Sequence, residues 1–166
     1  MSARTRRRPL PLVAGVVVCA VLGATLAACG GNEVDVPSYD VAPSVRTACQ
    51  KLLAALPDEV ADQKRRTTEG SDLATAWGDP AIVLRCGVGL PEEFGPLSSC
   101  QRANGVDWFV PDRIIEDQRA DVVMTTVGRS VNVEVRVPAK YRPSLAPMTD
   151  LAPALTASTT VVKACQ

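Results

Sequence analysis

The chain has 166 residues, with 18 lysines and arginines, 18 aspartates and glutamates, and no histidine. Four of the basic residues lie within residues 1–28, whereas all of the acidic residues follow, so residues 29–166 carry a net charge of −4. A net acidic chain argues against nucleic-acid binding. The missing histidine removes Ser-His-Asp and Cys-His catalysis and the commonest metal ligand.

The N-terminal segment is typical of a bacterial lipoprotein signal peptide. Arginines up to Arg8 form a positive region, residues 10–26 are apolar, and Leu26-Ala27-Ala28-Cys29 has the pattern of a lipobox. We expect cleavage between Ala28 and Cys29 and a diacylglycerol group on the Cys29 thiol. Two long acyl chains hold a protein stably on a bilayer. The predicted location is therefore the extracytoplasmic face of the cell membrane.

Other fates of this segment stay open. An apolar run of roughly 20 residues can remain as a transmembrane helix, and cleavage can also lead to plain secretion. The many Ala and Gly residues and the position of Cys29 favour the lipoprotein. Arg6-Arg7-Arg8 admits a twin-arginine export route, although Pro9 follows where that motif prefers a polar or aromatic residue.

The remainder of the chain has the length of one domain. Residues 29–43 mix acidic residues, Gly and Pro without periodicity, which predicts a flexible tether. We expect a single globular domain over residues 44–166.

The first expected element of that domain is an amphipathic helix. Ser44 is a suitable N-cap, apolar residues follow at helical spacing from Val45 to Leu56, and Pro57 ends the pattern. A strand is expected within residues 60–68. This segment holds the only basic cluster after residue 28, Lys64-Arg65-Arg66, which we interpret as a solvated edge.

Strands dominate the middle of the sequence. Residues 81–88 and 106–110 are apolar runs that predict buried strands. Residues 122–127 and 131–137 flank Gly128-Arg129-Ser130 and predict a hairpin, and valines alternate with polar residues in its second arm. Three prolines after Tyr141 permit short helical pieces, chiefly around residues 150–157. The fold class is therefore α+β: an antiparallel sheet, one N-terminal amphipathic helix and a short helical C-terminal tail.

The cysteines predict two disulfides. Without Cys19 in the signal peptide and the acylated Cys29, an even set of four remains in an exported domain. Of the three possible connectivities we favour Cys86–Cys100, which closes a loop rich in Gly and Pro, and Cys49–Cys165, near the two ends of the domain.

Catalytic and metal-binding motifs are missing from the sequence. There is no Cys-x-x-Cys pair, and Gly87-Val88-Gly89 precedes Leu90-Pro91 rather than opening a helix as a dinucleotide site would. Glu92-Glu93 and Glu116-Asp117 are adjacent carboxylates, which we interpret as solvated loops because neighbours in sequence do not face one another. We predict no catalytic residues, no metal and no cofactor.

Six polar and aromatic residues around the predicted sheet are candidates for a ligand site. The structural interpretation has the tryptophans filling the core and the arginines pairing with carboxylates across the sheet. The functional interpretation has an Arg and a Trp holding an anionic or sugar ligand in a shallow pocket. The six residues are Trp77, Asp79, Arg85, Trp108, Arg129 and Glu134.

Five stretches resemble an actinobacterial family of exported proteins, domain of unknown function 3515. They are CQKLLAALP (49–57), AWGDP (76–80), LRCGV (84–88), NGVDW (104–108) and TTVGR (125–129). The resemblance runs through most of the predicted domain. It implies an exported, usually lipid-anchored envelope protein, and it assigns no activity and no catalytic residue.

Two functional hypotheses follow. The first is a non-enzymatic envelope lipoprotein that binds a partner protein or a cell-wall component beside the membrane. The second is a His-free envelope enzyme, or a ligand-binding protein, that acts on a glycan or lipid. A pocket joining Arg85, Arg129 and a carboxylate would favour the second, and an exposed apolar patch would favour the first.

Overall fold

A computed structural model describes residues 33–165 of the chain. The predicted signal peptide and the predicted lipidation site at Cys29 lie outside the described residues. Within the described part, no helix has the length and hydropathy needed to cross a membrane.

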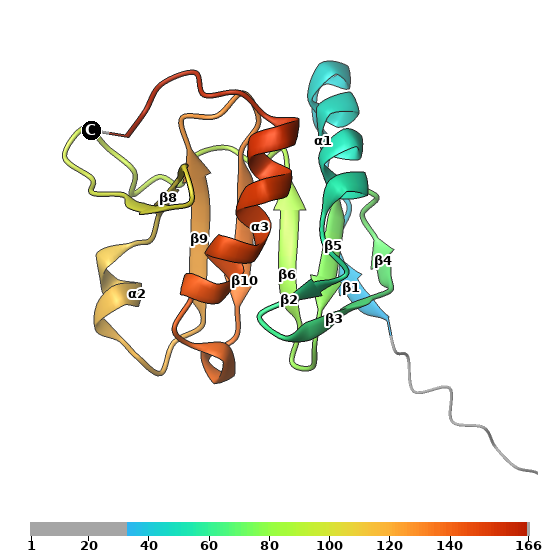
Figure 1. The fold of residues 1–166 in the computed structure, drawn as a ribbon, viewed down its shortest axis with the longest axis horizontal. Coiled ribbons are helices and arrows are strands. Elements are labelled where there is room, and N and C mark those ends of the chain that lie inside the picture. The colour runs from blue at the N-terminus through green and yellow to red at the C-terminus, as the bar shows by residue number, and fades with distance from the viewer. Residues whose placement is uncertain (1–32, 166) are drawn as a thin grey trace, which may run out of the picture.

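An eight-stranded antiparallel sheet forms the frame of the domain (Figure 1). Its strands follow the order β2-β3-β5-β6-β10-β9-β8-β7. Their bounds are β2 Glu59–Val60, β3 Gln63–Arg66, β5 Ala74–Trp77, β6 Ile82–Cys86, β7 Gln101–Ala103, β8 Val106–Phe109, β9 Val122–Val127 and β10 Val133–Val137. A separate parallel pair joins β1 Val34–Val36 to β4 Thr68–Gly70.

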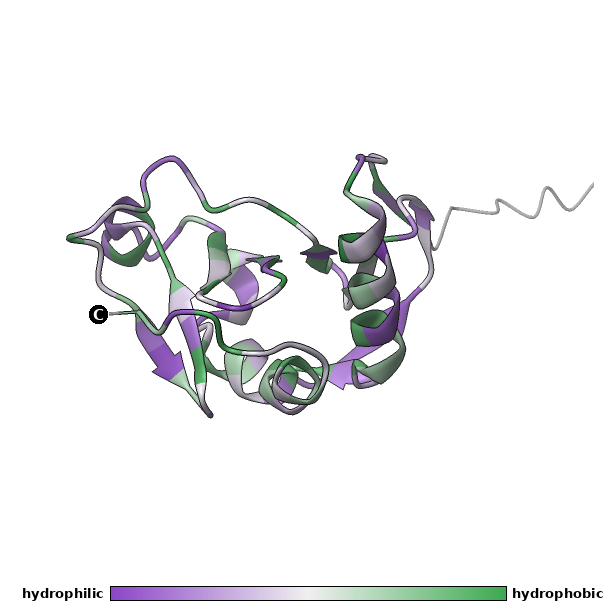
Figure 2. Cartoon of the chain, turned by 90° about the horizontal axis from the view of Figure 1, so that it is seen from above, coloured by the Kyte–Doolittle hydropathy of each residue, from purple (hydrophilic) through white to green (hydrophobic). Residues whose placement is uncertain are grey.

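Two longer helices cover one face of this sheet. α1 Pro43–Ala55 and α3 Leu145–Ser158 contact each other and contribute buried residues to the same hydrophobic core as the sheet. Seen from above, the helices carry hydrophobic and hydrophilic residues together (Figure 2). α2 Asp112–Glu116 and the 3-10 helix Ala139–Tyr141 are short connections.

The predicted N-terminal helix is α1, with a different start. Ala42 is the N-cap residue and makes no side-chain capping bond, so the prediction of Ser44 as N-cap is wrong. Pro43 takes the first helical position instead, where a missing N–H removes no helical hydrogen bond and the fixed φ suits the helix. Cys49 and Leu52 face the core as the spacing predicted.

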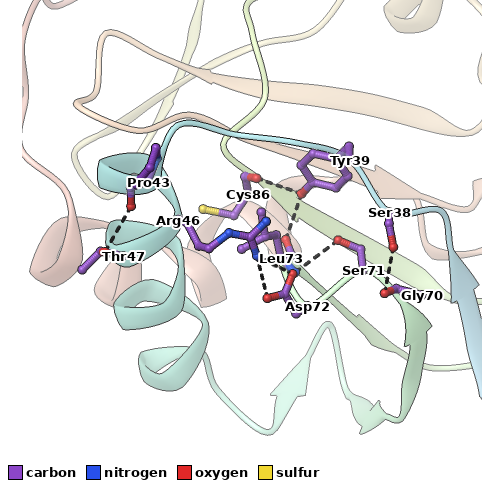
Figure 3. A network of polar contacts seen from close by, with 10 residues as sticks. All are labelled: Ser38, Tyr39, Pro43, Arg46, Thr47, Gly70, Ser71, Asp72, Leu73 and Cys86. Carbon is purple, nitrogen blue, oxygen red and sulfur yellow. Dashed lines mark hydrogen bonds and ion pairs between the residues drawn. The ribbon is translucent and has the colours of Figure 1, made fainter.

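The tether predicted over residues 29–43 is wrong from residue 33 onward. Val36 is buried, and its carbonyl accepts the Ser71 N–H at 2.8 Å. The Tyr39 hydroxyl lies 3.0 Å from the Leu73 carbonyl oxygen and 2.8 Å from that of Cys86 (Figure 3). Strand pairing and the partly buried Tyr39 side chain hold this segment in the fold. Its strand, β1, has three residues and is too short to show as a period in the sequence.

The predicted hairpin is confirmed. β9 and β10 pair antiparallel, and β10 also pairs with β6, so it lies inside the sheet. Val131, Val133, Val135 and Val137 are all buried, whereas the polar residues between them are partly or fully exposed. The alternation in the sequence therefore assigned the two faces of this strand correctly.

Other elements differ from the sequence-based expectations. Residues 60–68 are split among three strands, because Ala61 and Asp62 turn the chain with positive φ. β5 and β7 were not predicted.

The C-terminal helix α3 is one helix of 14 residues rather than short pieces. It tolerates Pro147 in its first turn, where the N–H is unpaired in any helix, and Pro153 on its exposed face, while Met148, Leu151 and Leu155 pack into the core.

Residues 33–165 contain two disulfides, but both predicted pairs, Cys86–Cys100 and Cys49–Cys165, are wrong. Cys49 pairs with Cys86 (Cα–Cα 5.6 Å) and Cys100 with Cys165 (Cα–Cα 6.2 Å). Cys49 lies on the buried face of α1 and Cys86 is the last residue of β6, so the bond attaches this helix face to the end of that strand. Residues 87–100 do not fold back on β6. They cross to β7, where the end of the chain also arrives.

The hairpin yields a test of the sheet faces. Val133→Asp places a carboxylate without a partner at a fully buried position and should prevent folding. Glu134→Gln, on the opposite face, should change the free energy of unfolding by less than about 1 kcal/mol, because its partner Arg85 is half exposed. Thermal melts of both variants check this. A Val133→Asp protein as stable as the wild type would mean that the faces are reversed.

Candidate binding cleft

The tryptophans among the candidate residues belong to the core. Trp77 and Trp108 are both completely buried. The Trp77 indole N–H donates to the Pro57 carbonyl at 3.0 Å, and the Arg65 guanidinium lies 5.6 Å from its ring. Neither indole is available to a ligand, which supports the structural interpretation of these two residues.

Arg85 and Glu134 form a cross-strand pair. They are direct neighbours in the register of β6 and β10, with 3.6 Å between the Arg85 Nη1 and the Glu134 Oε1. The Arg85 guanidinium also lies 4.6 Å from the centre of the Tyr39 ring. Asp79 is remote from this pair: its exposed carboxylate lies 3.8 Å from the Arg66 Nη1.

Arg129 holds the end of α3. Its Nη2 donates to the carbonyls of Leu155 at 3.2 Å and Thr159 at 2.9 Å, and its Nε donates to the Thr159 hydroxyl. Carbonyls at a helix C-terminus have no partners within the helix, and a cation there is favoured by the helix dipole. Burial lowers the pKa of Arg129, and the charge of Asp107 opposes that shift. The six candidates thus occupy separate places and form no common pocket.

The C-terminal tail, residues 159–165, lies beside the loop that carries Arg129. The Val162 N–H donates to the Gly128 carbonyl at 2.8 Å, and the Ser130 N–H donates to the Thr160 carbonyl at 2.8 Å. Gly128 has a φ of +69°, and a Cβ there would overlap with the Lys163 carbonyl oxygen. Only glycine permits this approach of the tail.

Asp107 connects the same tail to the sheet. It accepts two hydrogen bonds from Arg102, at 2.6 and 2.9 Å, and one from the Cys165 N–H at 3.1 Å. Hydrogen bonding from Arg102 holds the pKa of the Asp107 carboxyl below its ordinary value. Sequence reasoning missed this residue, although the signal was present. Asn104-Gly105 is a strong two-residue hairpin turn, which places Arg102 opposite Asp107.

Between the tail and the loop of residues 87–100 lies a cavity of about 520 Å³, which we call the apolar cleft. The apolar side chains of its wall come from both segments and from β9, and polar side chains complete it. The apolar residues are Leu90, Phe94, Pro96, Val127, Val162 and Ala164, and the polar side chains are those of Ser98, Arg129, Asn132 and Lys163.

Large hydrophobic side chains are exposed around this cleft. Leu90 is 46% exposed, Leu97 99%, Val161 62% and Val162 70%. Leu97 lines a second hollow that shares Gly95, Pro96 and Ser98 with the apolar cleft. Phe94 fixes the intervening loop by an edge-on contact with Phe109, at 5.2 Å between ring centres. The cleft and its rim can therefore take up apolar groups.

Two carboxylates near the cleft, those of Asp107 and Glu93, are paired with arginines. Arg102 binds Asp107, and Arg113 binds Glu93 at 2.9 Å. Among residues 33–165, no group of three or more His, Cys, Asp or Glu side chains is arranged to hold a metal ion. The lining of the cleft is mainly apolar. Sequence reasoning missed it, and its one signal was the set of large apolar residues in a Gly- and Pro-rich loop.

The contact at Gly128 can be tested by substitution. Gly128→Ala should displace the tail, since it adds an overlap to the strain of a positive φ, which costs on the order of 1–3 kcal/mol. Gly105→Ala is the control, because Gly105 also has a positive φ (+82°) but faces open space. Hydrogen exchange of residues 160–165 should accelerate only in Gly128→Ala. Equal acceleration in both variants would contradict the proposed contact.

Comparisons with known proteins identify the family of this chain. Searches of curated proteins and of solved structures gave no match. The model of one protein family, whose description reads "Protein of unknown function", matches residues 8–163, which is nearly the whole chain. The chain belongs to the family DUF3515.

Proposed function

We propose that this protein is a lipid-anchored lipoprotein of the bacterial cell envelope that binds an apolar segment of a partner protein in the apolar cleft, without catalysing a reaction. The observation that carries the proposal is the set of exposed Leu and Val side chains at the cleft. Complete burial of a Val or Leu side chain contributes roughly 1.5–3 kcal/mol. Contiguous exposed apolar surface is characteristic of interaction sites.

The anchoring part of the proposal rests on the lipobox and on the start of the fold. β1 begins at Val34, five residues after Cys29. An extended chain spans at most about 3.6 Å per residue, so β1 would start within about 18 Å of the lipid-bearing residue. β1 and the C-terminal tail lie at opposite ends of the domain (Figure 1). The anchored end would thus be the one remote from the apolar cleft.

A second candidate is the binding of a lipid. Lys163 contributes to the wall of the cleft, and its position would suit an anionic head group on an apolar chain. A partner segment is favoured because the exposed hydrophobic residues extend beyond the cavity, to Leu97 and Val161. An enzymatic role has no comparable support, since Asp107 and Glu93 are paired with arginines.

Lipid anchoring is tested at Cys29. Cys29→Ala should abolish lipid labelling, because it removes the thiol that would be acylated, and should yield a full-length precursor or a soluble product. Metabolic labelling with an alkyne fatty acid measures this. Equal incorporation into the wild type and the Cys29→Ala protein would refute the lipoprotein assignment.

Binding at the cleft is tested with a soluble chain that starts at Gly30, since the whole described core lies after it. The probe is the apolar dye anilinonaphthalene sulfonate. Val162→Asp should weaken dye binding at least tenfold, because it introduces a charge into the cleft. Leu145→Asp is the control, at an exposed leucine at the other end of α3. Equal binding by all three proteins would contradict the proposed site.

Displacement of the bound dye distinguishes an apolar peptide from a lipid as the ligand of the cleft. A short Leu- and Val-rich peptide should displace the dye from the wild-type cleft. Displacement by sodium oleate but not by the peptide would favour the lipid candidate.

A further inference from the structure

The two disulfides lie in different environments. Cys49 and Cys86 are both 0% exposed and belong to the hydrophobic core. Packing around them is tight, since a Cβ added to Gly87 would lie 3.3 Å from the Cys49 Sγ and 2.8 Å from the Val45 Cγ1. Cys100 and Cys165 are partly exposed at the surface. A thiol reagent can therefore reach the second bond in the folded protein but not the first.

The exposed disulfide connects the two walls of the apolar cleft. Cys100 ends the loop of residues 87–100, which provides Leu90 and Phe94 to one wall. Cys165 ends the tail, which provides Val162 and lines the cleft itself. No other covalent bond joins these two segments within the described residues.

Apart from this disulfide, mainly hydrogen bonds hold the tail. Val161 and Val162 are mostly exposed, so its burial of apolar surface is small. Hydrogen bonds hold residues 160–165 to Gly128, Ser130 and Asp107, and Arg129 and Leu155 hold Thr159. Each such bond contributes only about 0.5–1.5 kcal/mol net. The end of the tail thus depends on Cys165 for its position.

We propose that Cys100–Cys165 is a site of thiol–disulfide exchange, and that its reduction by a dithiol opens the apolar cleft while Cys49–Cys86 keeps the domain folded. This inference rests on the proposed function, because it concerns control of the same cleft. The partner class is a dithiol reductant, and the corresponding disulfide oxidant closes the cleft again.

The exchange proceeds in two balanced steps. A thiolate of the dithiol attacks one sulfur of Cys100–Cys165, forms a mixed disulfide and releases the other cysteine as a thiolate, which takes up a proton. The second thiol of the reductant, once deprotonated, attacks the mixed disulfide and releases the remaining cysteine, which is protonated in turn. Two electrons and two protons pass to the protein, and the reductant becomes a disulfide.

Stepwise alkylation tests the order of reduction. The full chain, reconstituted in phosphatidylcholine vesicles, is treated with increasing dithiothreitol, quenched with N-ethylmaleimide and mapped by mass spectrometry. Cys100 and Cys165 should be labelled at least tenfold faster than Cys49 and Cys86. Simultaneous labelling of all four, or labelling of Cys49 and Cys86 first, would overturn the proposal.

Hydrogen exchange tests the opening itself on the same vesicle-bound protein. After partial reduction, residues 160–165 should exchange at least tenfold faster, whereas α1 and β6 should remain protected. Unchanged protection of the tail would overturn the proposal. This measurement decides the matter even if the substituted protein below fails to fold.

Dye binding connects the exchange to the cleft. The soluble chain with Cys100→Ser and Cys165→Ser together should bind anilinonaphthalene sulfonate at least tenfold more weakly than the oxidised wild type. Unchanged affinity in the double variant would overturn the proposal and leave the proposed function intact. No binding by the oxidised wild type would instead contradict the proposed function, and alkylation and hydrogen exchange would still decide whether the exposed bond controls the tail.

Discussion

The antiparallel pairing of β6 with β10 joins the two halves of the chain. Strands from the first half, β2, β3 and β5, extend the sheet on the β6 side, and strands from the second half, β9, β8 and β7, extend it on the β10 side. Cys86 and Val133 are neighbours in this pairing. The Cys49–Cys86 bond attaches α1 at the same place, and α3 packs against α1. The core, the exposed loop and the tail all depend on this central register.

Local patterns predicted the parts of the fold whose cause is local. The valines from Val131 to Val137 alternate because one face of β10 is buried, and α1 follows from its apolar spacing. The disulfide pairing could not be predicted in this way. It depends on where α1 packs and on the path of residues 87–100, and both are consequences of the tertiary structure rather than of the spacing between cysteines.

In the candidate site, too, local features could be predicted from the sequence and tertiary features could not. The structural interpretation had Arg85 pairing with a carboxylate across the sheet, and its neighbour in the register is Glu134. Arg129 binds carbonyls at the end of α3 instead of a carboxylate, a partner that no sequence pattern indicates. The apolar cleft lies between two irregular segments that are far apart in sequence. Their residues have no period, so only the folded chain shows that Leu90 and Val162 line the same cavity.

The two edge strands of the eight-stranded sheet affect how copies of this protein contact one another. β2 has two residues and β7 has three, and charged side chains such as Glu59 and Arg102 lie on them. Short, charged edge strands give a neighbouring chain few backbone groups to pair with. A protein fixed to a two-dimensional surface meets copies of itself far more often than one in free solution. Under the proposed lipid anchoring, the brevity of these edges would let many copies share a membrane without joining their sheets.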